Sequence, residues 1–424
     1  MTSIRLTDEE KKMLNGDFGS GVQQAMTLLT RFGAVFGAER MVPVDAVHLS
    51  TQCPRNLLRK MTEGVDTAKT LCSLHAAFDP SRIKEIGISE IKTGQFMATG
   101  ATLDSKVFQE QLEIFSRLGF LKTFTCAPYL VGIIPKHGDV VILTGSSGQI
   151  ISNSLFGARA NREAVPSALA SVVTGKTPET GLLKKKNRYA KILVELEGLN
   201  IEGFTDAHYG ALGYFIGGVA GLENIAISGL NRRPSFESLR LLMSPMPVSG
   251  GVTMCHIAGL TPESPTLEQA FGGAKPIQSV KAGKKELQDA WEQLHTADSR
   301  EVDHVAIGCP HCTIFELGEI ASILDGKKLS ENVSLLIGVG KPVVTLAEQM
   351  GYADIIIKAG GIFSPCCVGP SNPRVYLGDT PLIMATNSAK AAHYIVRGTE
   401  GKTKILYGSL RTCIETAITG KWVG

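Results

Sequence analysis

Residues 303–324 read DHVAIGCPHCTIFELGEIASIL, and this stretch decides the fold class. The apolar run 303–308 has the length and composition of a buried strand. A turn with Cys309 follows, and Thr313 with Glu316 three residues later forms a capping box, which predicts a helix to the end of the stretch. Strand, turn and helix in this order are typical of an α/β fold.

The same alternation continues towards the C-terminus. Apolar runs of strand length are separated by segments with helical spacing. Apolar strands that alternate with helices predict parallel sheets covered on both faces. We therefore expect strands over 333–339, 354–358, 382–385 and 404–407, and helices over 342–350, 388–396 and 410–419.

The N-terminal part contains the same kinds of element. A second capping box, Thr7 with Glu10, predicts a first helix. The fold class is therefore α/β with several domains, and we divide the chain into an N-terminal region, 1–250, and a C-terminal region, 251–424. Within the first region we expect helices over 22–36 and 108–118, a strand over 41–49 and a short strand that leads to Cys126.

Composition limits the class of protein. The chain has 424 residues, 43% hydrophobic and 20% charged, enough for a large core and about two or three domains. The net charge of +3 gives no strong electrostatic surface for nucleic acid or membrane. Nine irregularly spaced cysteines argue against a secreted disulfide framework. Because we find neither a signal segment nor an apolar run of roughly 18 residues, we expect a cytoplasmic protein.

Cysteines occur in three turns that lie in different thirds of the chain. They are Cys126, Cys309 and the adjacent pair Cys366 and Cys367. Each turn follows a predicted strand, and α/β folds bind ligands at the carboxyl ends of strands. If the turns meet, three thiolates could hold an iron–sulfur cluster, [4Fe-4S] or [2Fe-2S], with one of the adjacent pair as third ligand. Such a cluster leaves one iron atom open to substrate and acts as a Lewis acid.

The motif from Cys309 to Cys312 has two other interpretations. It could be half of a zinc site, but no second pair lies at zinc-ribbon or zinc-finger spacing. It could be a thioredoxin-type redox pair, which the strand–turn–helix context permits. In the cluster interpretation Cys309 is a ligand stabilised by the N-terminal dipole of the next helix, and Cys312 is a structural thiol. All three interpretations remain open at this point.

Several polar turns could bind a substrate. Arg159 and Arg162 could clamp a carboxylate through bidentate hydrogen bonds, and a solvated surface pair is the equal alternative. Ser146 and Ser147 could offer hydroxyl and backbone N–H groups to an anion. For His256 the ordinary alternative is a satisfied core histidine. For Asn387 and Ser388 it is a helix-capping role. The candidate substrate-binding residues are Ser146, Ser147, Asn153, Ser154, Arg159, Arg162, Ser249, His256, Asn387, Ser388 and Lys390.

Together these segments resemble the large subunit of the aconitase X family, a branch of the aconitase superfamily. The likeness spans nearly the whole chain, and the order and spacing of the segments agree. The resembling stretches are 125–130 (TCAPYL), 153–162 (NSLFGARANR), 249–252 (SGGV), 260–267 (LTPESPTL), 308–311 (GCPH) and 385–394 (ATNSAKAAHY).

The resemblance implies a dehydratase with an iron–sulfur cluster held by Cys126, Cys309 and one of Cys366 or Cys367. It also implies a swivelling small domain, expected here as a separate small subunit that carries the catalytic base, so no catalytic residue is assigned in this chain. Known substrates of the family are cis-3-hydroxy-L-proline and mevalonate 5-phosphate, both 3-hydroxy carboxylates. We expect the hydroxyproline reaction, with mevalonate 5-phosphate or another hydroxy acid as alternatives. A redox or iron-sensing protein that uses Cys309 and Cys312 is the alternative of another class.

The chain departs from the family pattern around the expected pocket. Family members usually carry a Glu at the position of Gly145 and a Gly-Val pair after Ser50. They usually read Asp-Thr-Cys where this chain reads Ser364-Pro365-Cys366-Cys367. These departures fall at positions that bear on which substrate is bound and on which cysteine is the third ligand.

Overall fold

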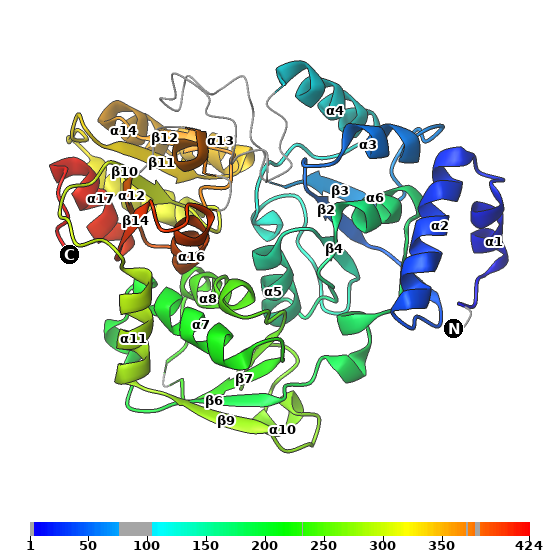
Figure 1. Cartoon of the computed structure of the whole chain (residues 1–424), viewed down its shortest axis with the longest axis horizontal. Helices are drawn as coiled ribbons and strands as arrows, with labels where there is room; N and C mark the ends of the chain where they lie inside the picture. The colour runs from blue at the N-terminus through cyan, green and yellow to red at the C-terminus, as the bar shows by residue number, and fades with distance from the viewer. Residues whose placement is uncertain (1–3, 76–103, 231, 370–371, 378–381) are drawn as a thin grey trace.

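The computed structural model describes residues 4–75, 104–230, 232–369, 372–377 and 382–424. In this part of the chain, three parallel sheets follow one another in sequence, and helices cover each of them (Figure 1). The expected α/β class with parallel sheets flanked by helices is confirmed.

The first unit has a three-stranded sheet in the order β3-β2-β4. The expected strand over 41–49 is divided: Ala46–Leu49 (β2) is buried in this sheet, whereas Met41–Pro43 (β1) pairs antiparallel with β5. Other elements are α1 (Asp8–Asn15), α2 (Ser20–Val35), α3 (Arg55–Met61), β3 (Leu71–Leu74), α4 (Ser105–Arg117), η4 (Pro128–Leu130), β4 (Val141–Leu143), α5 (Ser146–Leu155), α6 (Val165–Thr174), β5 (Lys176–Pro178), η5 (Gly181–Leu183) and η6 (Lys185–Asn187).

The second unit has a four-stranded parallel sheet in the order β8-β7-β6-β9. The division expected after residue 250 falls inside this unit, between α9 and β8. Its elements are β6 (Ile192–Leu196), η7 (Ile201–Gly203), α7 (Asp206–Ala220), β7 (Ile225–Ser228), α8 (Phe236–Met243), α9 (Met246–Ser249), β8 (Cys255–Ile257), α10 (Leu267–Ala270), β9 (Gln278–Ala282) and α11 (Lys284–Leu294).

The third unit has a five-stranded parallel sheet in the order β12-β11-β10-β13-β14. Most of its expected elements are confirmed, including the capping box of Thr313 and Glu316 at the start of α12. Its elements are β10 (His304–Ile307), α12 (Ile314–Leu324), β11 (Ser334–Gly338), α13 (Lys341–Gln349), α14 (Tyr352–Ala359), β12 (Ile362–Ser364), α15 (Pro373–Leu377), β13 (Ile383–Thr386), α16 (Ala389–Gly398), β14 (Lys404–Tyr407) and α17 (Leu410–Thr419).

The strand expected over 354–358 is wrong, because these residues lie in the helix α14. Three consecutive isoleucines favour a strand locally. Ala353, Ile356 and Ala359 are instead buried at helical spacing in the core of the third unit. A glycine in the left-handed conformation bounds the helix at each end. Packing therefore outweighed local strand propensity.

The short strand expected before Cys126 is also wrong. Only one bridge, between Ser73 and Leu121, joins this segment to β3. The chain then turns at Phe124, whose φ of 44° lies in the left-handed region that ends extended pairing. Residues other than glycine rarely adopt this conformation, and it is common near functional sites.

The three units share a hydrophobic core. One cluster of buried side chains combines Ile150 of α5, Ile216 of α7 and Tyr407 of β14, one from each unit. α7 and α8 lie side by side, and Gly213 permits their close approach (Figure 1). A Cβ at Gly213 would lie 1.8 Å from the carbonyl oxygen of Leu242, so no larger residue fits there.

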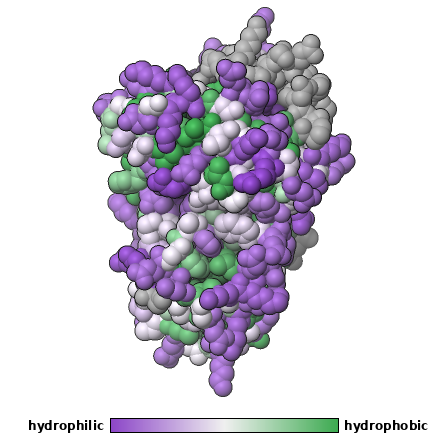
Figure 2. Space-filling model, turned by 90° about the vertical axis from the view of Figure 1, so that its left-hand side faces the viewer, coloured by the Kyte–Doolittle hydropathy of each residue, from purple (hydrophilic) through white to green (hydrophobic). Residues whose placement is uncertain are grey.

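The surface is mixed in character. Figure 2 shows one face, on which hydrophilic residues predominate and hydrophobic residues form smaller patches. Scattered apolar positions of this kind are normal on protein surfaces. Among the described residues, no helix is both long enough and apolar enough to cross a membrane.

Asp206, in the first turn of α7, links the second and third units. Its carboxylate accepts hydrogen bonds from Asn387 Nδ2 at 2.7 Å and from the Leu410 backbone N–H at 2.9 Å. Burial raises the pKa of Asp206 to about 6, although these hydrogen bonds oppose the shift. The folded chain therefore binds more protons than the unfolded chain between the ordinary pKa of 3.8 and about 6. Stability should decrease as the pH rises through this window.

We predict that Asp206→Asn removes this pH dependence. Relative to the variant, the wild-type chain should lose about 1–3 kcal/mol of stability as the pH rises from about 4 to 7. Differential scanning calorimetry across this range would measure the effect. Asp289→Asn, which removes a half-exposed carboxylate from α11, controls for the loss of one charge. Parallel pH profiles of wild type and Asp206→Asn would contradict the raised pKa.

Candidate active site at a topological switch point

The cysteine turns converge where the first and third units meet. Cys309 follows β10, the central strand of the third sheet, and Cys367 follows β12. The sheet continues through β11 and β12 on one side of β10 and through β13 and β14 on the other, which makes this edge a switch point where α/β proteins bind ligands. Cys126 comes from the first unit, and its Sγ accepts a hydrogen bond from the His311 backbone N–H at 3.2 Å.

Electrostatic interactions group Cys367 with the other two thiols. The hydrogen bond with Cys367, and then burial, raise the pKa of Cys309 well above its ordinary value. Burial, and then the neighbouring Cys367, raise the pKa of Cys126 to about 11. Both effects require the sulfur of Cys367 to lie close to the other two. The ammonium group of Lys390 opposes both shifts, because a positive charge favours the thiolate.

Cys366 contributes its backbone to the turn. Its carbonyl oxygen lies 3.0 Å from His311 Nε2, and its N–H donates to Ser364 Oγ at 3.1 Å. Its side chain is buried in the core. The neighbouring thiol of Cys367 interacts with both Cys126 and Cys309, and its role as a ligand remains a proposal.

His311 has an unused acceptor inside the cysteine turn. Burial lowers the pKa of His311 to about 3, so the imidazole is neutral at neutral pH. Because Nε2 faces a carbonyl oxygen, we place the proton on Nε2 and the lone pair on Nδ1. This Nδ1 is buried and has no hydrogen-bond partner among the described residues.

Lys390 joins the first and third units close to Cys126 and Cys309. Its Nζ donates to Ser146 Oγ at 2.9 Å and to Ser147 Oγ at 2.8 Å. The two serines open α5, and Lys390 lies in the first turn of α16, so the starts of two helices meet. α5 has no side-chain cap. A cation, two hydroxyls and an uncapped helix N-terminus together suit an anionic group.

Asn387 and Ser388 support the turns of the site. Ser388 is the N-cap of α16, since its Oγ accepts from the Ala391 N–H at 3.1 Å. The same hydroxyl donates to the carbonyl oxygen of Cys309. Asn387 donates to Asp206. These contacts agree with the capping alternative and fix the Cys309 turn.

Arg240 of α8, which the sequence did not suggest, ties the cysteine turns to the second unit. Its side chain is 0% exposed. The guanidinium donates to the carbonyl oxygen of His311, to Glu316 Oε2 at 3.1 Å and to Tyr129 Oη at 3.3 Å. Glu316 caps α12, and Tyr129 follows Cys126 in the chain. One cation therefore binds segments on both sides of the thiols.

Four other predicted residues bind backbone segments together. None of these hydrogen bonds reaches a cysteine turn, so substrate-binding roles for the four remain predictions. The pairs are Asn153 with Ala160, Ser154 with Cys255, Ser249 with Pro245 and His256 with Arg188.

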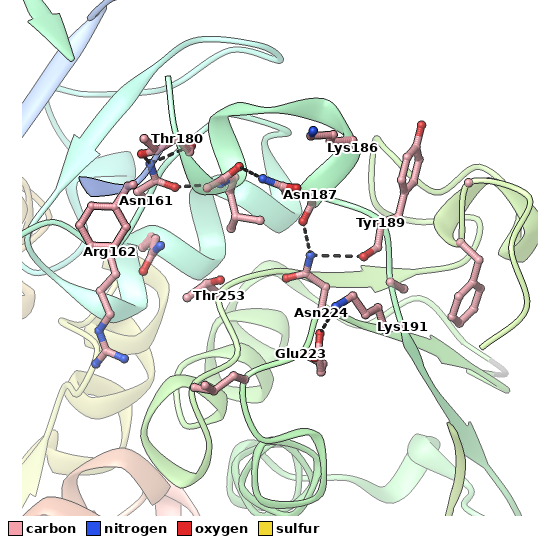
Figure 3. A pocket seen from close by; sticks show the side chains of 18 of the residues that line it. Asn161, Arg162, Thr180, Lys186, Asn187, Tyr189, Lys191, Glu223, Asn224 and Thr253 are labelled. Atoms are coloured by element: carbon pink, nitrogen blue, oxygen red, sulfur yellow. Dashed lines mark hydrogen bonds and ion pairs between the residues drawn. The ribbon is translucent and has the colours of Figure 1, made fainter. Parts of the chain in front are cut away.

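Arg159 and Arg162 line two separate cavities. A bridge pairs Leu143 with Arg162, so Arg162 lies beside the carboxyl end of β4. Arg162 lines a cavity of about 800 Å³ between the first and second units, where its side chain extends away from Asn161 (Figure 3). Arg159 lines another cavity of about 740 Å³. The two arginines therefore do not line one common cavity in this structure. A substrate-binding role for either arginine stays a prediction.

Two histidines near the cysteine turns were also missed. His48 of β2 is buried, with Nδ1 2.7 Å from Ser73 Oγ and Nε2 2.7 Å from the carbonyl oxygen of Thr125, next to Cys126. The ring of His75, which directly follows β3, lies 5.3 Å from the ring of His48. The position of His75 after an apolar strand was a usable signal, because the same rule selected the cysteines.

Comparisons with known protein families agree with the three units of the fold. The model of the aconitase X first domain matches residues 3–186, that of the second domain matches 190–292 and that of the third domain matches 302–419. These ranges correspond to the three sheets.

Individual relatives match nearly the whole chain. The phosphomevalonate dehydratase large subunit of Methanothermobacter thermautotrophicus is 34% identical over 92% of this chain and 94% of its own length. The cis-3-hydroxy-L-proline dehydratase of Pseudomonas aeruginosa is 29% identical over 98% of this chain and 70% of its own length. The crystal structure of Thermococcus kodakaraensis aconitase X in its holo-form has a TM-score of 0.80 and 28% identity, and the match covers 98% of this chain and 100% of that chain.

We predict that Arg240→Met strongly destabilises the chain. The variant leaves the Glu316 carboxylate and the His311 carbonyl without their buried cation, and such a loss costs about 3–5 kcal/mol. Thermal denaturation would measure it. Arg232→Met, at an exposed position of the same unit, should stay within about 0.5 kcal/mol of wild type. Equal stability of the two variants would contradict the role given to Arg240.

Proposed function

The chain belongs to the aconitase X family, and on that premise we propose that it is the large subunit of a hydro-lyase that dehydrates a small 3-hydroxy carboxylate. The observation that carries the proposal is the meeting of Cys126, Cys309 and Cys367 beside Lys390. Its relatives are named dehydratases, and dehydratases are hydro-lyases. A thiol site with an adjacent anion-binding turn suits this reaction.

The donor set fits an iron–sulfur cluster. The His311 N–H donates to the sulfur of Cys126, a kind of hydrogen bond that tunes clusters. Gly369 leaves room at Cys309, because a Cβ there would lie 3.0 Å from the sulfur. No three His, Cys, Asp or Glu side chains in the described part of the chain are arranged to hold a single metal ion. An iron–sulfur cluster differs from such a site, because its cysteines bind different iron atoms.

We assign the substrate carboxylate to the first turn of α5. Lys390, the hydroxyls of Ser146 and Ser147, and the uncapped N–H groups supply positive potential and donors for it. Because Lys390 also interacts with the thiols, a carboxylate held there lies beside the cysteine turns. When bound, the cluster would supply a Lewis-acidic iron that eases loss of the substrate hydroxyl. The base that takes the proton next to the carboxylate is assigned to the small subunit.

cis-3-Hydroxy-L-proline is the first candidate substrate. A phosphate cradle would favour converging arginines, and Arg159 and Arg162 line separate cavities. Mevalonate 5-phosphate is the second candidate, because phosphomevalonate dehydratase large subunits from two archaea match this chain at 31% and 34% identity. Both compounds are 3-hydroxy carboxylates and would share the carboxylate site.

We propose a small swivelling-domain subunit as the partner and the cytoplasm as the location. The relatives named large subunits support the first proposal. None of the nine cysteines, all of which lie in the described part of the chain, forms a disulfide bond, which supports a reducing compartment. Burial raises the pKa of Cys312 well above its ordinary value, which disfavours a Cys309–Cys312 redox pair.

Anaerobic reconstitution with iron and sulfide should give a brown protein. Serine variants of Cys126, Cys309 and Cys367 should each lose the visible absorbance and bound iron. Cys366→Ser and Cys312→Ser are the matched controls and should keep both. Loss of colour in Cys366→Ser but not in Cys367→Ser would reassign the third ligand. Loss in Cys312→Ser, with a reversible Cys309–Cys312 disulfide, would favour the redox protein.

The complex co-expressed with its small subunit should dehydrate one of the two candidate compounds under argon. Lys390→Met should raise KM about 10- to 100-fold, because it removes the cation from the carboxylate site. Lys285→Met, on the exposed face of α11, is the control. A complex with full iron content that dehydrates no 3-hydroxy carboxylate would contradict the proposed function.

A further inference from the structure

His75 occupies the space in front of Gly145, the residue at the start of α5. Its backbone N–H donates to the carbonyl oxygen of Leu49 at 2.8 Å, which fixes it at the carboxyl end of the first sheet. A Cβ on residue 145 would lie 2.6 Å from Nε2 of His75. The imidazole therefore stands where any other side chain at position 145 would begin.

The backbone does not require a glycine at position 145. Its φ of −103° and ψ of 126° are ordinary for every L-residue. The obstacle to a side chain there is the imidazole of His75. Gly145 and His75 are thus one structural pair, in which the missing side chain makes room for the ring.

The pair lies between the two parts of the site. Gly145 directly precedes Ser146 and Ser147, which bind Lys390. On its other side, His75 approaches His48. Burial is the largest effect that lowers the pKa of His48, and the charge of His75 is the second largest. His48 in turn contacts the carbonyl oxygen next to Cys126.

We propose that His75 is a substrate-contacting residue that, together with Lys390, binds the carboxylate of the 3-hydroxy acid at the first turn of α5. This inference deepens the proposed function and rests on it. His75 is half-buried at the start of α5. A second nitrogen donor fixes the direction of a carboxylate as well as its position, and so aims the hydroxyl at the thiols.

A double-mutant cycle on the reconstituted two-subunit complex tests the proposal. His75→Ala, Gly145→Ala and the double variant are compared with wild type on cis-3-hydroxy-L-proline and mevalonate 5-phosphate. Each single variant should lower kcat/KM about tenfold or more, mainly through KM. The double variant should be no worse than His75→Ala, because Gly145→Ala acts by displacing the ring. Gly218→Ala, at a helix glycine with nothing within 4 Å, should match wild type.

The same cycle is repeated by isothermal titration calorimetry of both compounds with the full chain, with iron content recorded for every variant. Single variants within twofold of wild type, losses that multiply in the double variant, or loss of iron in His75→Ala would overturn the role of His75. A complex that dehydrates neither compound while binding follows the cycle would refute the proposed reaction and support the carboxylate site. Wild type that binds neither compound would overturn both.

Discussion

One buried guanidinium fixes the geometry on which the site depends. Arg240 comes from the second unit, whereas its partners Tyr129 and Glu316 come from the first and third units. A cation removed from water needs several acceptors, because its desolvation costs several kcal/mol. The second unit contributes none of the three grouped thiols, yet it determines where the thiols of the other units lie.

The charge balance of the site suits the iron–sulfur cluster that we propose. Burial raises the pKa of the Cys126 thiol, so without metal the thiols stay protonated. Lys390 and Arg240 act against this shift and reduce the cost of forming thiolates, which metal binding requires. Lys390 also binds the serines that open α5. The same cation therefore serves the thiols and the proposed carboxylate site.

The relatives match this chain over most of its length but carry two substrate names. The fold alone therefore does not choose the substrate. The choice must come from side chains around the bound molecule, and we propose that these lie at the first turn of α5. The His75–Gly145 pair lies at this turn, and it depends on the absence of a single Cβ.

Local sequence predicted the α/β class and most elements of the third unit, because capping and hydrophobic periodicity act over a few residues. The capping box at Thr313 is one example, and the isoleucine run over 354–358 failed because packing overrode its propensity. The cysteine turns were visible as candidates, but only tertiary structure showed that Cys367 interacts with Cys126 and Cys309. Only tertiary structure brought Lys390 to Ser146, 244 residues away, because no local pattern encodes contacts between distant segments.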